Sequence, residues 1–153
     1  MMEKELKVNA IKNGTVIDRI PSNVLFKVIS ILGLQNCENQ ITFGMNLDSK
    51  KLGKKAIIKV TDRFFTSDEV NRIALIAPMA KLNIIRDYEV VEKRNVEVPE
   101  IVENIIKCIN PRCITNHENI HTKFRQVSSD PVEMQCYYCE KLIVQEHFEM
   151  VNN

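Results

Sequence analysis

The stretch Cys108-Ile109-Asn110-Pro111-Arg112-Cys113, followed by Cys136-Tyr137-Tyr138-Cys139, decides the fold of the last third of this chain. Two closely spaced cysteine pairs allow two turns to present two sulfurs each to one tetrahedral metal ion. Four thiolates leave no coordination position for water, so the metal that this pattern predicts, zinc, has a structural role. Four unrelated buried thiols, or two disulfides, are the alternative interpretations of the same cysteines.

The region around these pairs is short, and a charged segment interrupted by Pro99 separates it from the rest of the chain. We expect one domain at residues 1–98 and a second at residues 99–153. The second domain is too small to be stable on its hydrophobic core alone, and a bound metal would supply the missing stability. The fifth cysteine, Cys37, lies between polar residues in an expected loop and has no predicted role.

The first domain combines strand and helix patterns. Leu6, Val8 and Ala10 alternate with polar residues as in a half-buried strand, and four further segments read as extended, at residues 16–20, 41–47, 56–60 and 82–91. Helices are expected at residues 21–33, ended by a glycine, and at residues 66–78, opened by a capping box and ended by a proline. The order predicts an α+β fold: a ferredoxin-like βαββαβ domain followed by a small, mainly β, four-cysteine zinc domain.

The charge balance of the chain gives no evidence for a strongly charged partner. Lysine and arginine total 21 and aspartate and glutamate total 20, for a net charge of +1. A near-neutral chain gives no general reason to expect nucleic acid or membrane as a partner. No apolar run approaches the length that spans a bilayer, and the polar start resembles no signal peptide, so a cytoplasmic location is expected.

One motif suggests catalysis but lacks the context for it. His117-Glu118-Asn119-Ile120-His121 has the letters of a metalloprotease zinc helix. Its flanks are polar, and the domain is too small to hold a substrate cleft, so a surface loop is the favoured interpretation. No other catalytic constellation is present, and we expect no enzyme activity. A zinc-ribbon nucleic-acid binder is a rival, but acidic residues balance the basic ones in residues 99–153.

Residues 8–21, 41–47, 55–59, 77–78 and 87–91 closely resemble the aspartate carbamoyltransferase regulatory chain, as do both cysteine pairs. The resemblance covers nearly the whole chain. It implies a regulatory subunit of pyrimidine biosynthesis whose first domain binds CTP and ATP, with UTP as a further candidate effector. It also implies a zinc domain that contacts the catalytic chain, and regulatory dimers that link catalytic trimers.

The resemblance also implies roles for individual residues. The residues that would line the base pocket are Ala10, Ile11 and Tyr88. The residue that would bind the ribose is Asp18. The resemblance completes the nucleotide site with Lys59, Asn83, Ile85 and Val90, and it assigns to the triphosphate Lys93, with Arg19 standing where family members often carry histidine. Candidates for contact with a second nucleotide are Lys51 and Lys55. The expected interface with the catalytic chain comprises Asn110, Arg112, Tyr138, Glu140 and Lys141.

Overall fold

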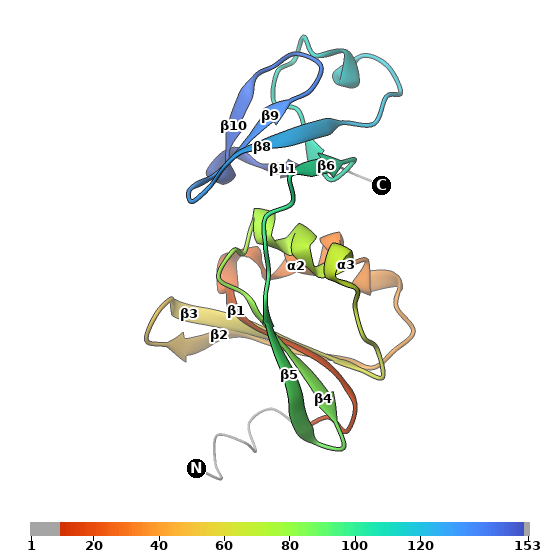
Figure 1. Ribbon diagram of the computed structural model, residues 1–153, viewed down its shortest axis with the longest axis vertical. Coiled ribbons are helices and arrows are strands. Elements are labelled where there is room, and N and C mark those ends of the chain that lie inside the picture. Colours follow the sequence, from red (N-terminus) through yellow and green to blue (C-terminus); the bar gives the residue numbers. More distant parts are fainter. Residues whose placement is uncertain (1–9, 152–153) are drawn as a thin grey trace.

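The computed structural model describes residues 10–151, which form two units stacked along the long axis of the molecule (Figure 1). The first unit contains β1 (Gly14–Pro21), α2 (Leu25–Ile31), β2 (Ile41–Ser49), β3 (Gly53–Thr61), α3 (Ser67–Asn71), β4 (Lys81–Arg86) and β5 (Glu89–Asn95). Short 3₁₀ turns, η1 (Ser22–Val24), η2 (Leu34–Asn36) and η3 (Arg72–Leu75), extend or follow the two helices. The predicted strand at residues 6–10 falls mostly outside the described residues, and Ala10 precedes β1.

The five strands form one antiparallel sheet in the order β2-β3-β1-β4-β5. Its first four strands have the order of a ferredoxin-like sheet, which confirms the predicted fold class. The expected single strand over residues 82–91 is wrong, because the chain reverses at Asp87 and Tyr88 to form the hairpin β4–β5. Both residues have positive φ, 52° and 68°, as a two-residue hairpin turn that matches the strand twist requires.

Local signals set the limits of both helices. Gly33 adopts a left-handed conformation with φ 66° just after the first helix, which ends there as expected. The Thr66 hydroxyl accepts a hydrogen bond from the Glu69 amide at 3.2 Å, and Glu69 accepts one from the Thr66 amide at 2.9 Å, so the predicted capping box forms. The second helix is shorter than expected, since α3 passes into a 3₁₀ turn before Pro78.

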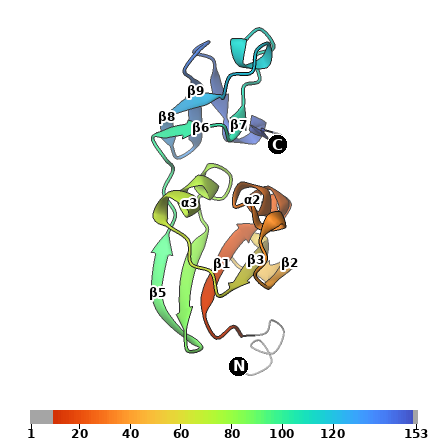
Figure 2. The same cartoon turned by 90° about the vertical axis from the view of Figure 1, so that its right-hand side faces the viewer.

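One face of the sheet is buried and the other is not. Ile17 of β1 pairs with Ile58 of β3 and Leu82 of β4, and all three side chains are fully buried. Both helices lie on this side of the sheet (Figure 2). Because side chains alternate along a strand, the residues between these core positions point to the opposite, helix-free side. We call this side the open face.

The second unit is small and mainly β, as predicted. Its strands are β6 (Ile101–Glu103), β8 (Lys123–Ser129), β9 (Val132–Cys136) and β10 (Leu142–Val144) in one sheet, and β7 (Ile106–Lys107) with β11 (Glu149–Met150) in another. The 3₁₀ turns η4 (Ile114–Asn116) and η5 (Gln145–His147) complete it. Phe124, Met134 and Ile143 fill its small core. No helix in residues 10–151 has the length and apolar character to cross a membrane.

Candidate metal centre and ligand face

The four cysteines of the C-terminal unit come from two turns. Cys108 follows β7 and Cys113 precedes η4, and between them Asn110 accepts hydrogen bonds from the amides of Arg112 and Cys113. Cys136 ends β9, and the Glu140 amide donates to its carbonyl at 2.9 Å, while Glu140 itself has a φ of 65°. These turns hold each sulfur pair on one side of the loop, as the spacing predicts.

The structure brings all four sulfurs together within 4.8 Å of one another. Cys108 Sγ lies 3.6 Å from Cys139 Sγ, and Cys113 Sγ lies 3.7 Å from Cys136 Sγ. A tetrahedral ion with metal–sulfur bonds of about 2.3 Å separates its ligand sulfurs by about 3.8 Å. A disulfide would need about 2.05 Å, and all five cysteines are free thiols. The sulfurs therefore fit a tetrahedral metal and form no disulfides.

Burial makes two of the four thiols of this cluster harder to ionise. Burial raises the pKa of the Cys108 and Cys136 thiols, because ionised sulfur loses its water there. For Cys139 burial also opposes ionisation, but hydrogen bonds from Asn110 and from the Lys141 backbone outweigh it and lower the pKa to about 7. A bound cation would hold all four as thiolates. A closed four-sulfur tetrahedron is typical of zinc or of an iron–sulfur centre.

The histidine motif belongs to no metal site among the described residues. His117, Glu118 and His121 are exposed and lie outside any helix, so the two imidazoles do not share a helix face. The His117 ring lies 2.8 Å from the Pro111 carbonyl and braces the loop between the first two cysteines. This arrangement matches the surface loop that the polar flanks predicted.

Three candidate nucleotide-binding residues of the first unit lie in a row across the open face. Val16 of β1 pairs with Lys59 of β3 on one side and with Asn83 of β4 on the other, and Asn83 pairs with Lys93 of β5. Directly paired residues of an antiparallel sheet point to the same face. Three polar side chains that are widely separated in sequence therefore form one line around Val16. Burial lowers the pKa of Lys59.

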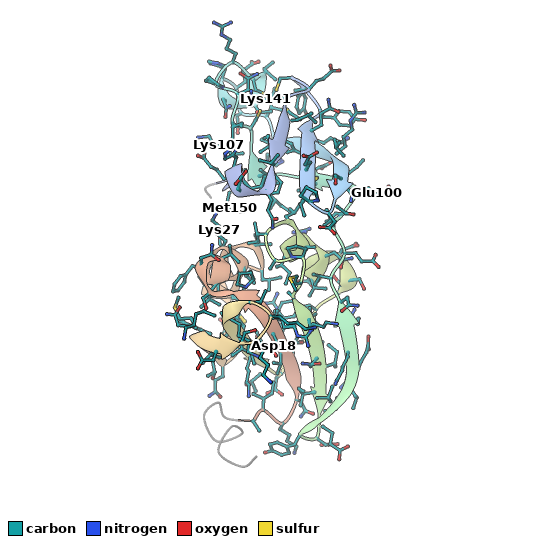
Figure 3. All side chains as sticks on the ribbon, turned by 90° about the vertical axis from the view of Figure 1, so that its left-hand side faces the viewer. Asp18, Lys27, Glu100, Lys107, Lys141 and Met150 are labelled. Atoms are coloured by element: carbon teal, nitrogen blue, oxygen red, sulfur yellow. The ribbon has the colours of Figure 1, made fainter. Side chains whose placement is uncertain are left out.

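Two more candidate nucleotide-binding residues, Asp18 and Lys55, lie on the same face next to this row. The Lys55 ammonium lies 3.0 Å from Asp18 Oδ1 and 3.2 Å from Oδ2, and both side chains are about a quarter exposed. Next to them Arg19 has a φ of 59° and forms a β-bulge in β1. The Arg19 amide donates to Asp18 Oδ1 at 2.7 Å. The bulge thus orients the carboxylate of Asp18 toward Lys55 on the open face. Asp18 is labelled in Figure 3.

The remaining ligand candidates lie at the far end of the sheet or beyond it. The Tyr88 amide donates to the Lys12 carbonyl at 2.9 Å, which holds the segment with Ala10 and Ile11 beside the β4–β5 turn. Ile85 and Val90 pair in that hairpin. Lys51 lies in the β2–β3 turn, outside the paired strands, so the structure does not bring it into the row.

Sequence reasoning missed one cation of the open face. Lys81 begins β4 two residues before Asn83, so the two side chains share a face, and Lys81 pairs directly with Asp18. The alternation of polar and apolar residues in Lys81-Leu82-Asn83 carried this signal. Without the register between β1 and β4, nothing connected that alternation to Asp18.

The candidate interface residues surround the metal loops. Asn110 is half-buried, and the other four are exposed: Arg112, Tyr138, Glu140 and Lys141. Asn116 donates to the Asn110 carbonyl at 2.7 Å and to the Cys108 carbonyl at 3.0 Å, which fixes the first loop. The exposed side chains therefore project from a backbone that the sulfurs and these hydrogen bonds hold in place.

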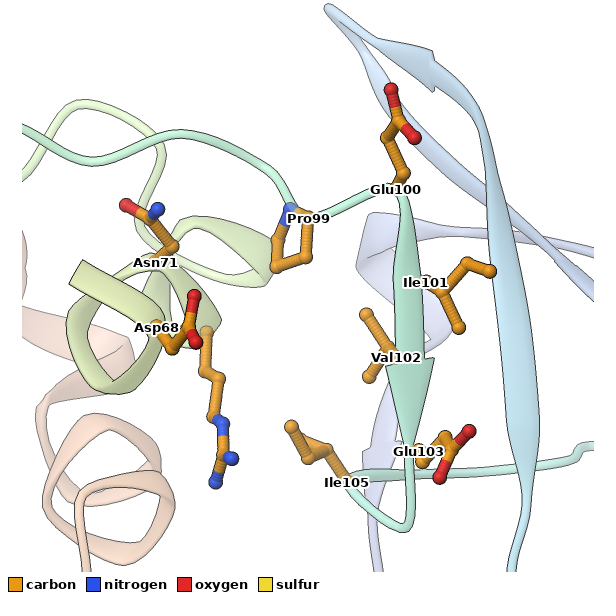
Figure 4. Close-up of a pocket in the computed structure, with 9 residues that line it drawn as sticks. Asp68, Asn71, Pro99, Glu100, Ile101, Val102, Glu103 and Ile105 are labelled. Carbon is orange, nitrogen blue, oxygen red and sulfur yellow. The ribbon is translucent and has the colours of Figure 1, made fainter. Parts of the chain in front are cut away.

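A groove of about 480 Å³ lies where the two units meet. Asp68, Asn71 and Arg72 line it from the α3 side, and residues 99–103 together with Ile105 line it from the linker and β6 (Figure 4). The amide of Glu97 in the linker donates to the Asn71 side chain at 3.1 Å. The linker is thus attached to the end of α3 before it enters the second unit.

Comparisons with known proteins agree with both units. Residues 6–97 match the model of the aspartate carbamoyltransferase regulatory chain, allosteric domain, and residues 100–149 match its metal binding domain. Aspartate carbamoyltransferase regulatory chains of Bacteroides fragilis and Pyrococcus horikoshii are 56% and 54% identical to this chain. The first alignment covers 91% of both chains, and the second covers 93% of this chain and 95% of the relative. The Porphyromonas gingivalis regulatory chain is 48% identical over 99% of this chain and all of its own length.

Proposed function

This chain belongs to the family of aspartate carbamoyltransferase regulatory chains, and we propose that it makes that enzyme responsive to CTP and ATP. It is a non-catalytic subunit with an allosteric domain and a metal-binding domain. The observation that carries the proposal is the row of Lys59, Asn83 and Lys93 on the open face of the allosteric domain. Pyrimidine biosynthesis is the pathway in which this control would act, and UTP is a further candidate effector.

The open face offers chemistry that suits a nucleotide. Lysine ammonium groups bind phosphate as point charges, and the Asn83 amide can both donate and accept hydrogen bonds. Asp18 can accept hydrogen bonds from ribose hydroxyls. The apolar pair Ile85 and Val90 lies toward the β4–β5 turn, where a base would find an apolar surface and the backbone of Tyr88. We assign the base to this end and the phosphates to the end near Lys93 and Arg19.

For the metal-binding domain we propose one structural zinc ion. Cys108, Cys113, Cys136 and Cys139 are its ligands, and their separations support a tetrahedral site. The ion would supply folding free energy to a domain whose core is small. With four protein sulfurs no coordination position stays open, so the ion takes no part in chemistry.

We further propose that the exposed side chains around the metal loops contact the catalytic chain. Tyr138 and Arg112 are exposed and belong to the residue types enriched at interface hot spots, while Glu140 and Lys141 add charges of both signs at the rim. Asn110 supports this surface from behind by holding the first loop. Loss of the metal would release both loops and with them the docking surface.

A regulatory dimer is the second assembly contact of the proposal. β2 is an edge strand, and its Phe43 packs edge-on against Phe26 of α2 with ring centroids 6.0 Å apart. Phe26, Phe43 and Met45 are 61%, 46% and 37% exposed, which is an apolar surface at an unpaired strand edge. Such edges invite pairing with another chain, and a second copy of this chain is the partner we assign to it.

The path from ligand to catalytic chain runs through β5. Lys93 faces the ligand side, whereas the next residue, Arg94, points to the helix side and donates to Ser67 Oγ at 3.1 Å and to the Phe65 carbonyl at 3.4 Å. Its Nε lies 3.0 Å from Glu92 Oε2, at ion-pair distance but without hydrogen-bond geometry. A shift of β5 would therefore move α3 and the linker. We place the boundary between the allosteric domain and the metal-binding domain in this linker, between residues 98 and 99.

The decisive experiment is aspartate saturation of the complex between this chain and its catalytic chain, with and without CTP or ATP. Each effector must shift the curve, because an effector changes activity at a distance only by binding two states with different affinity. Curves that overlay, despite confirmed assembly and nucleotide binding, reject the proposal. Arg94→Met should keep nucleotide binding and reduce the shift, while Lys27→Met on the exposed side of α2 should change neither.

A further inference from the structure

The charges of the open face are strongly uneven. At paired positions of the five strands this face carries one carboxylate, Asp18, and four ammonium groups, those of Lys55, Lys59, Lys81 and Lys93. The whole chain is nearly neutral, with a net charge of +1, so this excess is a local feature. A face with this imbalance attracts an anion with several charges.

The single carboxylate is already neutralised. Both oxygens of Asp18 lie within 3.2 Å of the Lys55 ammonium, and one of them also accepts a hydrogen bond from the Arg19 amide. Lys81 stands directly across from Asp18 on β4, yet it forms no ion pair with any residue from 10 to 151. Within the described part of the chain, the half-buried Lys81 thus keeps an uncompensated positive charge beside a neutralised pair.

Lys81 is also close to the residue assigned to the triphosphate. Asn83 pairs with Lys93 and Lys81 pairs with Asn95, so Lys81 and Lys93 occupy diagonal positions on neighbouring strands. Diagonal neighbours on one face of a sheet lie roughly 7–8 Å apart at the backbone, within reach of long side chains. Two lysines at this spacing can hold two different phosphate groups of one polyphosphate chain.

We propose that Lys81 and Lys93 form a two-lysine clamp for the outer phosphates of a nucleoside triphosphate. Lys81 then adds binding affinity only for ligands that carry these outer phosphates. This inference rests on the proposed function, since it assigns the phosphate end of the same site. Lys55 has no part in the clamp because Asp18 holds it. The clamp takes nucleoside triphosphates in preference to monophosphates, whatever their base.

The test compares CTP, CMP and inorganic tripolyphosphate by calorimetry on the full chain. Lys81→Gln should weaken CTP and tripolyphosphate by about tenfold or more, the usual cost of losing a hydrogen bond to a charged group. CMP affinity should stay unchanged, and Lys81→Arg should retain most CTP affinity because it keeps the charge. Lys27→Gln, which removes the same charge from the helix side (Figure 3), is the matched control and should change nothing.

The outcomes separate this inference from the proposed function. If Lys81→Gln weakens CTP and CMP equally, or weakens neither, the clamp is wrong while nucleotide binding stands. If the unmodified chain binds tripolyphosphate in a Lys81-dependent way but shows no preference for nucleotides over it, the clamp stands and the nucleotide proposal is wrong. If the unmodified chain binds none of the three ligands, both are rejected.

Discussion

The Lys55 ammonium of β3 lies between the two carboxylate oxygens of Asp18 in β1, at 3.0 and 3.2 Å. This pair fastens two strands at the point where the β-bulge of Arg19 interrupts their register. It also joins two residues for which the family resemblance implies separate roles, one at the ribose and one at a second nucleotide. Lys55 can reach a second nucleotide only by leaving Asp18.

A double-mutant cycle measures this pair. Asp18→Asn and Lys55→Gln should each destabilise the chain, and the double variant should cost less than their sum by roughly 1 kcal/mol, the upper range for partly exposed ion pairs. Urea unfolding at low and high salt provides the measurement, with a smaller coupling at high salt. Strictly additive effects would mean that the pair does not form in solution.

The row across the open face predicts a shared loss for both effectors. Lys93→Ala and Lys59→Ala should each weaken CTP and ATP together by about tenfold or more, because a contact to phosphate or ribose does not read the base. Calorimetry on the full chain measures both ligands. Lys54→Ala is the control, since its ammonium lies 2.6 Å from Asp48 at the distant hairpin. Unchanged affinity in both row variants would remove these residues from the site.

The sulfur cluster predicts one zinc ion per chain. Cys136→Ser should lose the metal and unfold the C-terminal unit, because the ion contributes about 10–16 kcal/mol in small zinc domains. Cys37→Ser should keep the metal, since Cys37 lies in the other unit, where its thiol donates a hydrogen bond to Asn39. Elemental analysis and far-UV circular dichroism give the two readouts. His117→Ala should also retain zinc. A loss of zinc in this variant would mean that the histidine motif does bind the metal.

The capping box predicts a stability difference that depends on pH. The hydrogen bond from the Thr66 backbone, helped by the Thr66 hydroxyl and by Arg63, lowers the Glu69 pKa below its ordinary 4.5 against the effect of burial. A depressed folded pKa means that ionised Glu69 stabilises the fold above the unfolded pKa, and that this stabilisation is lost as the pH falls through the folded value. Glu69→Gln should therefore lower stability at neutral pH and converge with the parent chain in acid.

Thr66→Ala should cost about 1 kcal/mol at neutral pH, the usual value of a helix N-cap, and should show the same convergence in part. Thermal unfolding followed between neutral pH and pH near 3 measures both variants. A Glu69→Gln difference that is constant over this range would show that the charge of Glu69 contributes nothing to the cap.

Local patterns were sufficient wherever the decisive atoms are close in sequence. Thr66 and Glu69 are three residues apart, and a capping box needs only that spacing at a helix start. Cys136 and Cys139 share one turn, so their spacing alone predicts that both sulfurs face the same side. The strand–helix order of the first unit likewise follows from the alternation of apolar residues, because each element must bury one face.

The hairpin β4–β5 lay beyond this kind of reasoning. No glycine, proline or asparagine–glycine turn signal interrupts residues 84–91, so the segment reads as one extended strand. The reversal depends on two left-handed backbone conformations and on the bond from the Tyr88 amide to Lys12, a residue far away in the sequence. A side-chain pattern does not record backbone handedness, which is why the turn was missed.

The sequence by itself determined the two-unit α+β plan, the four metal-ligating sulfurs and the family, since each depends on local spacing or on residue identity. Only the tertiary structure decided which charges meet on the open face. Because of strand register and one bulge, Lys59, Asn83 and Lys93 align and Asp18 is bound by Lys55, while Lys81 has no ion-pair partner in residues 10–151. Register arises from long-range pairing, and a shift of one residue would turn every one of these side chains to the other face.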